Sequence, residues 1–393
     1  MRSDFPMDAF LSSPYLHLRA LAEEVARESI APRASEVDAE AKWPEHSMRA
    51  LAEAGLLGLH VPRRLGGREM GLLALAVTSE AIARACPSSA LCYAMHCVGS
   101  AVMTAKATPT HREKYLEPIA AGEHVTTLAL SEAGTGAHFY LPQTSLTRDG
   151  DDLVVQGTKL FVTNGGHADS YVLSTRASVD GAEAGDFSCL VLDGDTEGLR
   201  WLDSWAGFGM RGNSSRGLRL DDVRVPTSNL LGSEGDQIWY VFEVVAPYFL
   251  IAMAGTYVGV AQAALDITLD SLRERRYAHS GEGLADVQVL QHRVAEISAA
   301  VTKTRGLVYH AAHLGDTGHS SAVVAIMLAK ADAGDTAVQV ANEAMTCCGG
   351  RAYAANSELS RLLRDARASH VMAPTTDILK TWAGRSLLGR PFL

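Results

Sequence analysis

The sequence is poor in cysteine and in basic charge, and each shortage excludes a class of protein. Six cysteines in 393 residues are too few for a disulfide scaffold, and the adjacent Cys347 and Cys348 cannot easily bridge each other. Lys and Arg number 35 against 45 Asp and Glu, so the formal net charge is -10. A general nucleic-acid binder normally carries the opposite sign. We therefore expect free thiols, a cytoplasmic location and no nucleic-acid partner.

Long apolar runs are also missing. The longest candidate, from Val241 to Val260, is interrupted by Glu243, Pro247 and several small residues, so no uninterrupted apolar stretch reaches the roughly 18 residues that span a bilayer. The start, MRSDFPMDAF, lacks the apolar block of a signal peptide. No membrane span is predicted, and no cysteine pairs at metal-ligand spacing suggest a metal site. Hydrophobic residues nevertheless make up 47% of the chain, which supports a sizeable core.

Three patterns follow one another along the chain. The first 120 or so residues carry apolar residues at helical spacing, such as Leu18, Leu21 and Val25. After Gly122, short apolar or alternating segments are separated by Gly, Asp and Asn, as in a small antiparallel β domain. The helical pattern returns near Gly235. The prediction is an α+β fold with a helical domain at 1–123, a middle β domain at 124–234 and a second helical domain at 235–393.

Individual elements are expected within this frame. Helices are predicted at 47–57, 70–86, 89–105, 238–276, 287–314, 322–345, 358–367 and 376–388. Strands are predicted at 125–130, 153–155, 160–162, 170–173, 188–191 and 217–223. Pro247 is expected to kink the helix at 238–276 or to split its start, because proline lacks the backbone donor that a helix interior needs.

The stretch Leu128-Ala-Leu-Ser-Glu-Ala-Gly-Thr-Gly-Ala-His138 is an apolar strand that ends in a glycine-rich turn. Glycines let backbone N–H groups face a ligand, and Ser131 offers both a donor and an acceptor. Such a turn can hold a phosphate or the edge of a polar heterocycle, or it can be purely structural. It is not GxGxxG and no P-loop lysine follows, so a parallel nucleotide-binding fold is not predicted.

Other stretches admit two interpretations each. Phe161 and Thr163 face the same side of a short strand, so a flat ligand can stack on the ring and bond to the hydroxyl, or Phe161 is a core residue. Arg275 ends a long helix, where it suits the helix dipole or a pyrophosphate. Gly349-Gly350 suits a helix C-cap, and Thr375 suits an N-cap.

Together and in this order, these stretches resemble the acyl-CoA dehydrogenase family of flavoproteins over nearly the whole chain. The resemblance implies a helical domain, a β domain and a C-terminal four-helix domain, assembled as a homotetramer or dimer with FAD at a subunit interface. It implies that the flavin lies near Leu130, Ser131, Phe161 and Thr163, and that Arg275 reaches the FAD of a neighbouring subunit. The implied FAD contacts are Leu130, Ser131, Gly136, Ala137, Phe161, Thr163, Arg275, Gly349, Gly350, Thr375 and Asp377.

One departure from the family concerns the catalytic base. Dehydrogenation needs a carboxylate that removes the α-proton on the substrate face opposite the flavin. The usual Glu position holds Ala373, and the alternative helical position holds Phe249, followed by Leu250 where an Arg is usual. Glu243, about 600° of helical rotation before Phe249, is the candidate for a displaced base. The backbone N–H of Ala373 can still polarise a carbonyl, because that contact needs no side chain.

His96 also has two interpretations. It lies on an apolar helix, where it is either a hydrogen-bonded core histidine or, as in related flavin-dependent oxygenases of this fold, a residue that faces the flavin.

The resemblance therefore implies a flavoenzyme that oxidises an acyl thioester between Cα and Cβ, with hydride transfer to flavin N5. The thioester would be carried by CoA or an acyl-carrier protein, and an electron-transfer flavoprotein or a reductase would be the redox partner. Two alternatives stay open. One is a flavin-dependent monooxygenase on the same fold, and the other is a non-catalytic partner subunit that supplies Arg275 to a neighbour.

Overall fold

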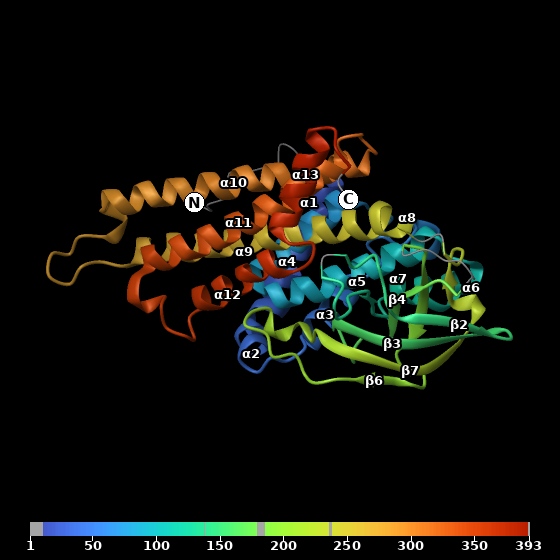
Figure 1. Ribbon diagram of the computed structural model, residues 1–393. Coiled ribbons are helices and arrows are strands. Elements are labelled where there is room, and N and C mark those ends of the chain that lie inside the picture. Colours follow the sequence, from blue (N-terminus) through green and yellow to red (C-terminus); the bar gives the residue numbers. More distant parts are fainter. Residues whose placement is uncertain (1–10, 137, 179–184, 236–237, 392–393) are drawn as a thin grey trace.

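Helices form both ends of the chain and strands form its middle (Figure 1). The computed structural model describes residues 11–136, 138–178, 185–235 and 238–391. The N-terminal helices are α1 (Ser13–Val25), α2 (Ala34–Ala39), α3 (Glu45–Glu53), α4 (Leu72–Ala85), α5 (Pro87–Ala105), α6 (Pro109–His111) and α7 (Glu117–Ala121). The C-terminal helices are α8 (Ile238–Tyr240), α9 (Ala246–Glu274), α10 (Gln288–Asp316), α11 (Ala322–Cys348), α12 (Glu358–Val371) and α13 (Thr376–Leu387). The predicted order of helices, strands and helices is confirmed.

Proline shapes the start of the longest predicted helix. Residues Val241–Val245 form a π-helical turn between α8 and α9, and Pro247 lies in the first turn of α9. Proline cannot donate to the carbonyl four residues earlier and clashes with it, so a locally wider turn is accommodated there. The helical path therefore continues through a π-helical turn and is not broken at Pro247.

Two four-stranded sheets form the middle of the chain, in the orders β1-β4-β5-β8 and β2-β3-β7-β6. The strands are β1 (Thr126–Ala129), β2 (Ser145–Asp149), β3 (Asp152–Val162), β4 (Ser170–Arg176), β5 (Phe187–Asp193), β6 (Leu199–Trp201), β7 (Arg216–Pro226) and β8 (Leu230–Leu231). Leu173 from the first sheet and Leu153 from the second belong to one apolar cluster, so the sheets pack face to face. The other face of the first sheet, with Val172 and Val191, packs on helix α5 through Val98.

Two details differ from the sequence prediction. The strands are not all antiparallel, because β1 pairs with β4 in parallel; the long intervening chain, which forms β2 and β3, permits that connection. The predicted strands at 153–155 and 160–162 are one strand, β3, with register shifts after Val155 and after Lys159. Gly157 lies in the first irregularity, where a Cβ atom would come within 2.6 Å of the Thr144 hydroxyl. Glycine at this point made the single strand look like two.

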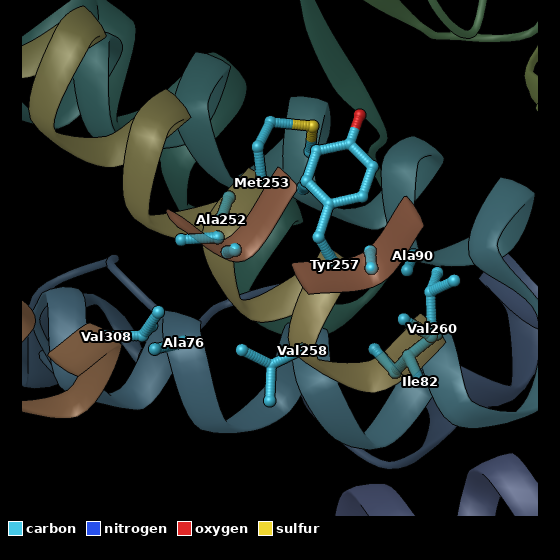
Figure 2. Close-up of a cluster of buried hydrophobic side chains, with 14 of the residues drawn as sticks. Ala76, Ile82, Ala90, Ala252, Met253, Tyr257, Val258, Val260 and Val308 are labelled. Carbon is cyan, nitrogen blue, oxygen red and sulfur yellow. The ribbon is translucent and has the colours of Figure 1, made fainter. Parts of the chain in front are cut away.

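The two helical regions share one hydrophobic core. Figure 2 shows Val258 and Val260 of α9 on the side of that helix where Ala76 and Ile82 of α4 lie, and all four belong to one buried cluster. The helices approach closely because small residues face each other: a Cβ atom on Gly255 would lie 2.5 Å from the carbonyl oxygen of Ala76. By length and composition, Val241–Glu274 could cross a membrane, but 78% of its most apolar stretch is buried inside the protein. It is the central helix of the core.

Candidate functional site

The two stretches Ser131–Gly136 and Phe161–Thr163 lie side by side. The backbone N–H of Leu160 donates to the carbonyl of Ser131 at 2.8 Å, and the Thr127 hydroxyl donates to the carbonyl of Thr163 at 2.9 Å. These bonds join the end of β1 to the end of β3, although the two motifs are about thirty residues apart. Two candidate ligand-binding stretches therefore form one surface.

Phe161 has an unusual conformation for a bulky residue. Its φ is +55°, in the left-handed region, and 63% of the residue is exposed, with its ring edge-on to Trp205 at 6.2 Å. A left-handed backbone costs about 1–2 kcal/mol in a residue with a side chain. Strain of this kind collects at binding sites. The core interpretation of Phe161 is not supported, because the ring faces outward and is free to stack on a flat ligand.

Thr163 and Ser131 supply polar groups beside that ring. The Thr163 hydroxyl is buried and shares a hydrogen bond of 3.0 Å with the Ser215 hydroxyl, in which either oxygen can donate. Ser131 and Leu130 are half-buried at the end of β1. A hydroxyl pair that can reverse its donor can adapt to either a donor or an acceptor on a ligand edge.

The glycine-rich turn is open. Gly134 and Gly136 have φ of +87° and +52°, and a Cβ atom built on either would meet no described atom within 4 Å. The space beside the turn suits a ligand that approaches the backbone closely. Ala137, predicted to line the same ligand, lies outside the described residues. His138 is exposed and bonded to the Tyr140 hydroxyl at 2.7 Å, which places it at the rim.

A buried ion pair holds this turn, and the sequence analysis missed it. Lys159 is fully buried, and its Nζ lies 2.5 Å from Oε1 of Glu132. Glu132 also accepts hydrogen bonds from the backbone N–H groups of Gln143 and Thr144 and from the Thr144 hydroxyl. Both ends of the segment 131–144 are thereby tied to β3. The signal available was the strand alternation, which gives Lys159 the same inward orientation as Leu153 and Val155.

Burial governs the protonation of this pair. Desolvation lowers the pKa of Lys159 to about 8, although the Glu132 carboxylate opposes the shift. Burial also opposes ionisation of Glu132, but Lys159 and Thr144 outweigh it, so the pKa of that carboxyl lies below its usual range. The pair is charged at neutral pH and has a structural role beneath the candidate ligand surface.

The predicted base position lies in the 372–375 turn between α12 and α13. Thr375 caps α13 by accepting a hydrogen bond of 3.4 Å from the N–H of Ile378, and Asp377 is exposed in the first turn of that helix. Ala373 is half-buried, and Pro374 is buried.

An apolar cavity of about 40 Å³ lies against Pro374. The residues around it include Tyr140, Phe242, Leu250, Leu379 and Trp382, and no carboxylate of the described residues lines it. Leu250 and the 372–375 turn thus meet across apolar space. Glu243 is exposed on the π-helical turn and is not among the described residues that line this cavity, so its role as a displaced base stays a prediction.

Of the two interpretations of His96, the structure supports the hydrogen-bonded core histidine. The residue is fully buried; its Nδ1 accepts the N–H of Thr126 at 3.1 Å, and its Nε2 lies 3.0 Å from the carbonyl of Leu57. Both ring nitrogens are therefore occupied by backbone groups, and burial lowers the pKa of the imidazole to about 4. A neutral ring that joins α5 to β1 has no nitrogen left for a ligand.

Three other predicted residues form a second group at the far end of the bundle. Arg275 donates to the carbonyl of Cys348 at 2.6 Å, next to the exposed pair Gly349 and Gly350. Figure 1 shows that the ends of α9 and α11 lie away from the strands. α9 has 29 residues, or about 43 Å at 1.5 Å per residue, and its start lines the cavity beside Tyr140. The group at Arg275 therefore lies at the opposite end of α9 from that cavity.

The chain matches three family models in order. They are described as acyl-CoA dehydrogenase N-terminal domain (residues 15–123), middle domain (127–223) and C-terminal domain (247–388). Cyclohex-1-ene-1-carbonyl-CoA dehydrogenase from Geobacter metallireducens is 33% identical over 94% of this chain and 96% of its own length. Cyclohexane-1-carbonyl-CoA dehydrogenase from the same organism is 32% identical over 93% and 95%.

A solved structure supports the same assignment. One chain of a solved structure, described as the electron transferring flavoprotein of Acidaminococcus fermentans, superposes on this chain with a TM-score of 0.91. The two are 27% identical in sequence, and the match covers 98% of this chain and 99% of that one. The agreement extends over the helical and the β regions alike.

Proposed function

Since the chain belongs to the acyl-CoA dehydrogenase family, we propose that it is an FAD-dependent oxidoreductase that dehydrogenates an acyl thioester between Cα and Cβ. The observation that carries the proposal is the joined ends of β1 and β3, which bring the exposed ring of Phe161, on a left-handed backbone, and the hydroxyl residues Ser131 and Thr163 into one region. When bound, FAD supplies the hydride acceptor. The relatives named above act on alicyclic acyl-CoA esters, so we propose a related CoA or carrier-protein thioester as the substrate.

The residues present fit this cofactor. Phe161 offers an exposed ring for the flat isoalloxazine, and the Ser131 and Thr163 hydroxyls can bond to its polar edges. Leu130 contributes backbone groups. The open turn at Gly136, with Ala137 beside it, has room for the pyrophosphate, and Thr375 and Asp377 at the start of α13 complete the set. A helix N-terminus favours anionic groups, which suits this last position.

We also propose that the active form is a homo-oligomer, a dimer or a tetramer. Arg275, Gly349 and Gly350 lie at the end of α9 opposite the cavity beside Tyr140, and we propose that they serve the cofactor of a neighbouring chain. The boundaries 1–123, 124–234 and 235–393 remain our proposal for the domains. The six free, buried cysteines support a cytoplasmic location.

The proton-transfer arrangement departs from the family. No carboxylate of the described residues lines the cavity at Pro374, so Ala373 can contribute only its backbone N–H to a substrate carbonyl. We propose that this contact polarises the thioester and that the α-proton leaves to a group supplied by another residue or by the substrate itself. An electron-transfer flavoprotein would reoxidise the flavin of a dehydrogenase, whereas a reductase would supply electrons to the flavin of a monooxygenase.

The decisive experiment is flavin uptake followed by anaerobic reduction. We expect the purified protein to be yellow with about one FAD per chain, and to bleach when cyclohex-1-ene-1-carbonyl-CoA or cyclohexane-1-carbonyl-CoA is added without oxygen. Protein that stays colourless after incubation with FAD would overturn the proposal. Flavin that binds but is bleached by no thioester would overturn the substrate class alone.

One observation favours a monooxygenase as the second candidate. The cavity at Pro374 is apolar throughout its described lining, as expected of an enzyme that needs no α-proton base. Oxygen consumption in the presence of a reductase and NADH, without any thioester, would select this function. The third alternative, a non-catalytic partner subunit, predicts copurification with a homologous chain, and turnover by a homo-oligomer with full flavin content would exclude it.

A further inference from the structure

Lys330, on α11, is buried without a counter-ion in the described part of the chain. Its side chain is fully enclosed, and its Nζ donates to the carbonyl of Ser369 at 2.7 Å and to the carbonyl of Pro374 at 3.1 Å. Burial lowers the pKa of the ammonium to about 8, with Asp335 opposing the shift, so the group is mostly charged at neutral pH. A buried charge is costly, and packing alone does not require one.

One of the two carbonyls, that of Ser369, precedes the 372–375 turn, and the other, that of Pro374, lies within it. Ser369 is in the last turn of α12, where carbonyl groups lack partners within the helix and the helix dipole attracts a cation. Pro374 directly precedes Thr375, the N-cap of α13. Thr376 also donates its hydroxyl to the carbonyl of Ser369, at 3.3 Å. One ammonium thus joins the end of α12 to the start of α13 across the turn.

The packing of α11 maintains this contact. One helical turn after Lys330, a Cβ atom on Gly334 would come within 2.9 Å of the Ser369 side chain, so the two helices nearly touch there. Asp335 bonds to His370 of α12 at 3.0 Å and to Lys380 of α13 at 2.6 Å. The outer ion pairs hold the helices together at the surface, whereas only Lys330 of these side chains bonds to the turn itself.

We propose that Lys330 is a positioning residue for the 372–375 turn, and that its ammonium orients the turn's backbone toward the cofactor and substrate now that Ala373 carries no charge. The inference rests on the proposed function, because the turn includes the Ala373 N–H and the FAD-contact candidate Thr375. It gives a fully buried lysine, which forms no ion pair among the described residues, a task that an apolar methionine could not perform.

The test compares Lys330→Met, Lys330→Arg and the matched control Lys380→Met in the full-length protein. Lys380→Met removes a positive charge from the outer pair but no contact to the turn. FAD dissociation constants are measured by titration of flavin-depleted protein, and amide hydrogen exchange is followed at residues 371–378 and in α4. We expect Lys330→Met to weaken FAD binding by about tenfold and to speed exchange at 371–378 only, because two charge-assisted hydrogen bonds are lost. Lys330→Arg should retain part of the FAD affinity and part of the protection at 371–378. Lys380→Met should change neither the affinity nor the exchange.

A pH series separates positioning from simple packing. In the wild type, protection at 371–378 should rise above about pH 8, after correction for intrinsic exchange, because the open form still binds a proton on Lys330 where the closed form has lost it, and Lys330→Met should lack this transition. The charged groups that face this point are Asp335 on α11, His370 on α12 and Lys380 on α13. Lys330→Met keeps all three, so a transition that it loses belongs to Lys330.

Failures of the two ideas are distinguishable. If the wild type binds no FAD, the proposed function fails, and the exchange measurements alone decide the role of Lys330. If the wild type binds FAD but Lys330→Met equals it in affinity and in exchange at 371–378, the positioning role is overturned. If Lys330→Met does not fold, Lys330→Arg and the wild-type pH series decide, and an unchanged protection up to about pH 9 contradicts the proposal.

Discussion

In two buried lysines, the free-energy cost of burying an ammonium group is offset in different ways. Lys159, under the glycine-rich turn, is neutralised by Glu132 at 2.5 Å, whereas Lys330, behind the 372–375 turn, is held by two carbonyl oxygens. Burial lowers the pKa of each to about 8. The turn on the β side keeps a charged pair beneath a polar surface, and the turn on the helical side borders an apolar cavity. The comparison teaches that a buried ammonium can be stabilised either by a carboxylate or by backbone carbonyls, according to what the neighbouring turn offers.

The largest expected effect is on the ion pair. Lys159→Met leaves Glu132 buried without its cation, and we expect the free energy of unfolding to fall by about 3–5 kcal/mol. The double variant Lys159→Met/Glu132→Leu should be more stable than the single one, because it removes the unpaired charge. Chemical denaturation followed by circular dichroism measures both. Equal stabilities of the single and double variants would show that the pair has no special electrostatic role.

His96 is also fully buried but, unlike the two lysines, it is neutral at pH 7. Its folded pKa of about 4 is below the ordinary 6.5, so the unfolded chain takes up a proton first as the pH falls. Stability is then lost between about pH 6.5 and about pH 4, by up to about 3 kcal/mol. Asp365, whose pKa burial raises to about 7, changes stability in the opposite sense over nearly the same range.

The variant His96→Gln isolates that contribution. Its amide can donate to Leu57 and accept from Thr126 without titrating. We expect the stability difference between wild type and variant to change with pH only in the window below about pH 6.5. Parallel stability curves from pH 7 to pH 4, measured by thermal unfolding, would contradict the assignment.

Charged side chains introduced at positions 373 and 250 test whether the cavity beside Pro374 tolerates charge. Ala373→Glu adds a carboxyl beside a cavity without polar partners, and we expect a loss of about 2 kcal/mol in stability. Adding Leu250→Arg should recover part of that loss, because Leu250 and the turn border the same cavity. Thermal unfolding of the single and double variants gives the coupling. A coupling of zero would mean that the two side chains do not meet.

The smallest effect on stability is expected at Phe161. The ring is 63% exposed, so Phe161→Ala should change the unfolding free energy by less than about 0.5 kcal/mol. FAD binding should nevertheless weaken by up to about tenfold, since an aromatic stacking contact is lost. Trp205→Phe, which keeps a ring beside position 161, is the matched control. If Phe161→Ala destabilises the flavin-free protein and leaves the affinity unchanged, the ring is structural.

Much of the fold was predictable from local pattern. Apolar residues at helical spacing marked α4, α5 and the long C-terminal helices, and turn residues marked the β region, because these signals act over a few neighbouring residues. Ser131, Phe161 and Thr163 were predicted as ligand-binding residues at strand ends; the structure joins those strand ends, and the binding role stays a prediction. The single strand β3 was missed, since Gly157 and Lys159 interrupt its apolar alternation.

Sequence by itself determined the order of helices and strands, the glycine-rich turn and the absence of a carboxylate at positions 373 and 249. Only the tertiary structure decided that Lys159 meets Glu132, that a left-handed backbone leaves Phe161 exposed, and that the backbone occupies both nitrogens of His96. It also decided that Lys330 meets carbonyls 39 and 44 residues away. Local spacing records which side of its own element a residue faces, whereas the partner found there depends on how distant elements pack.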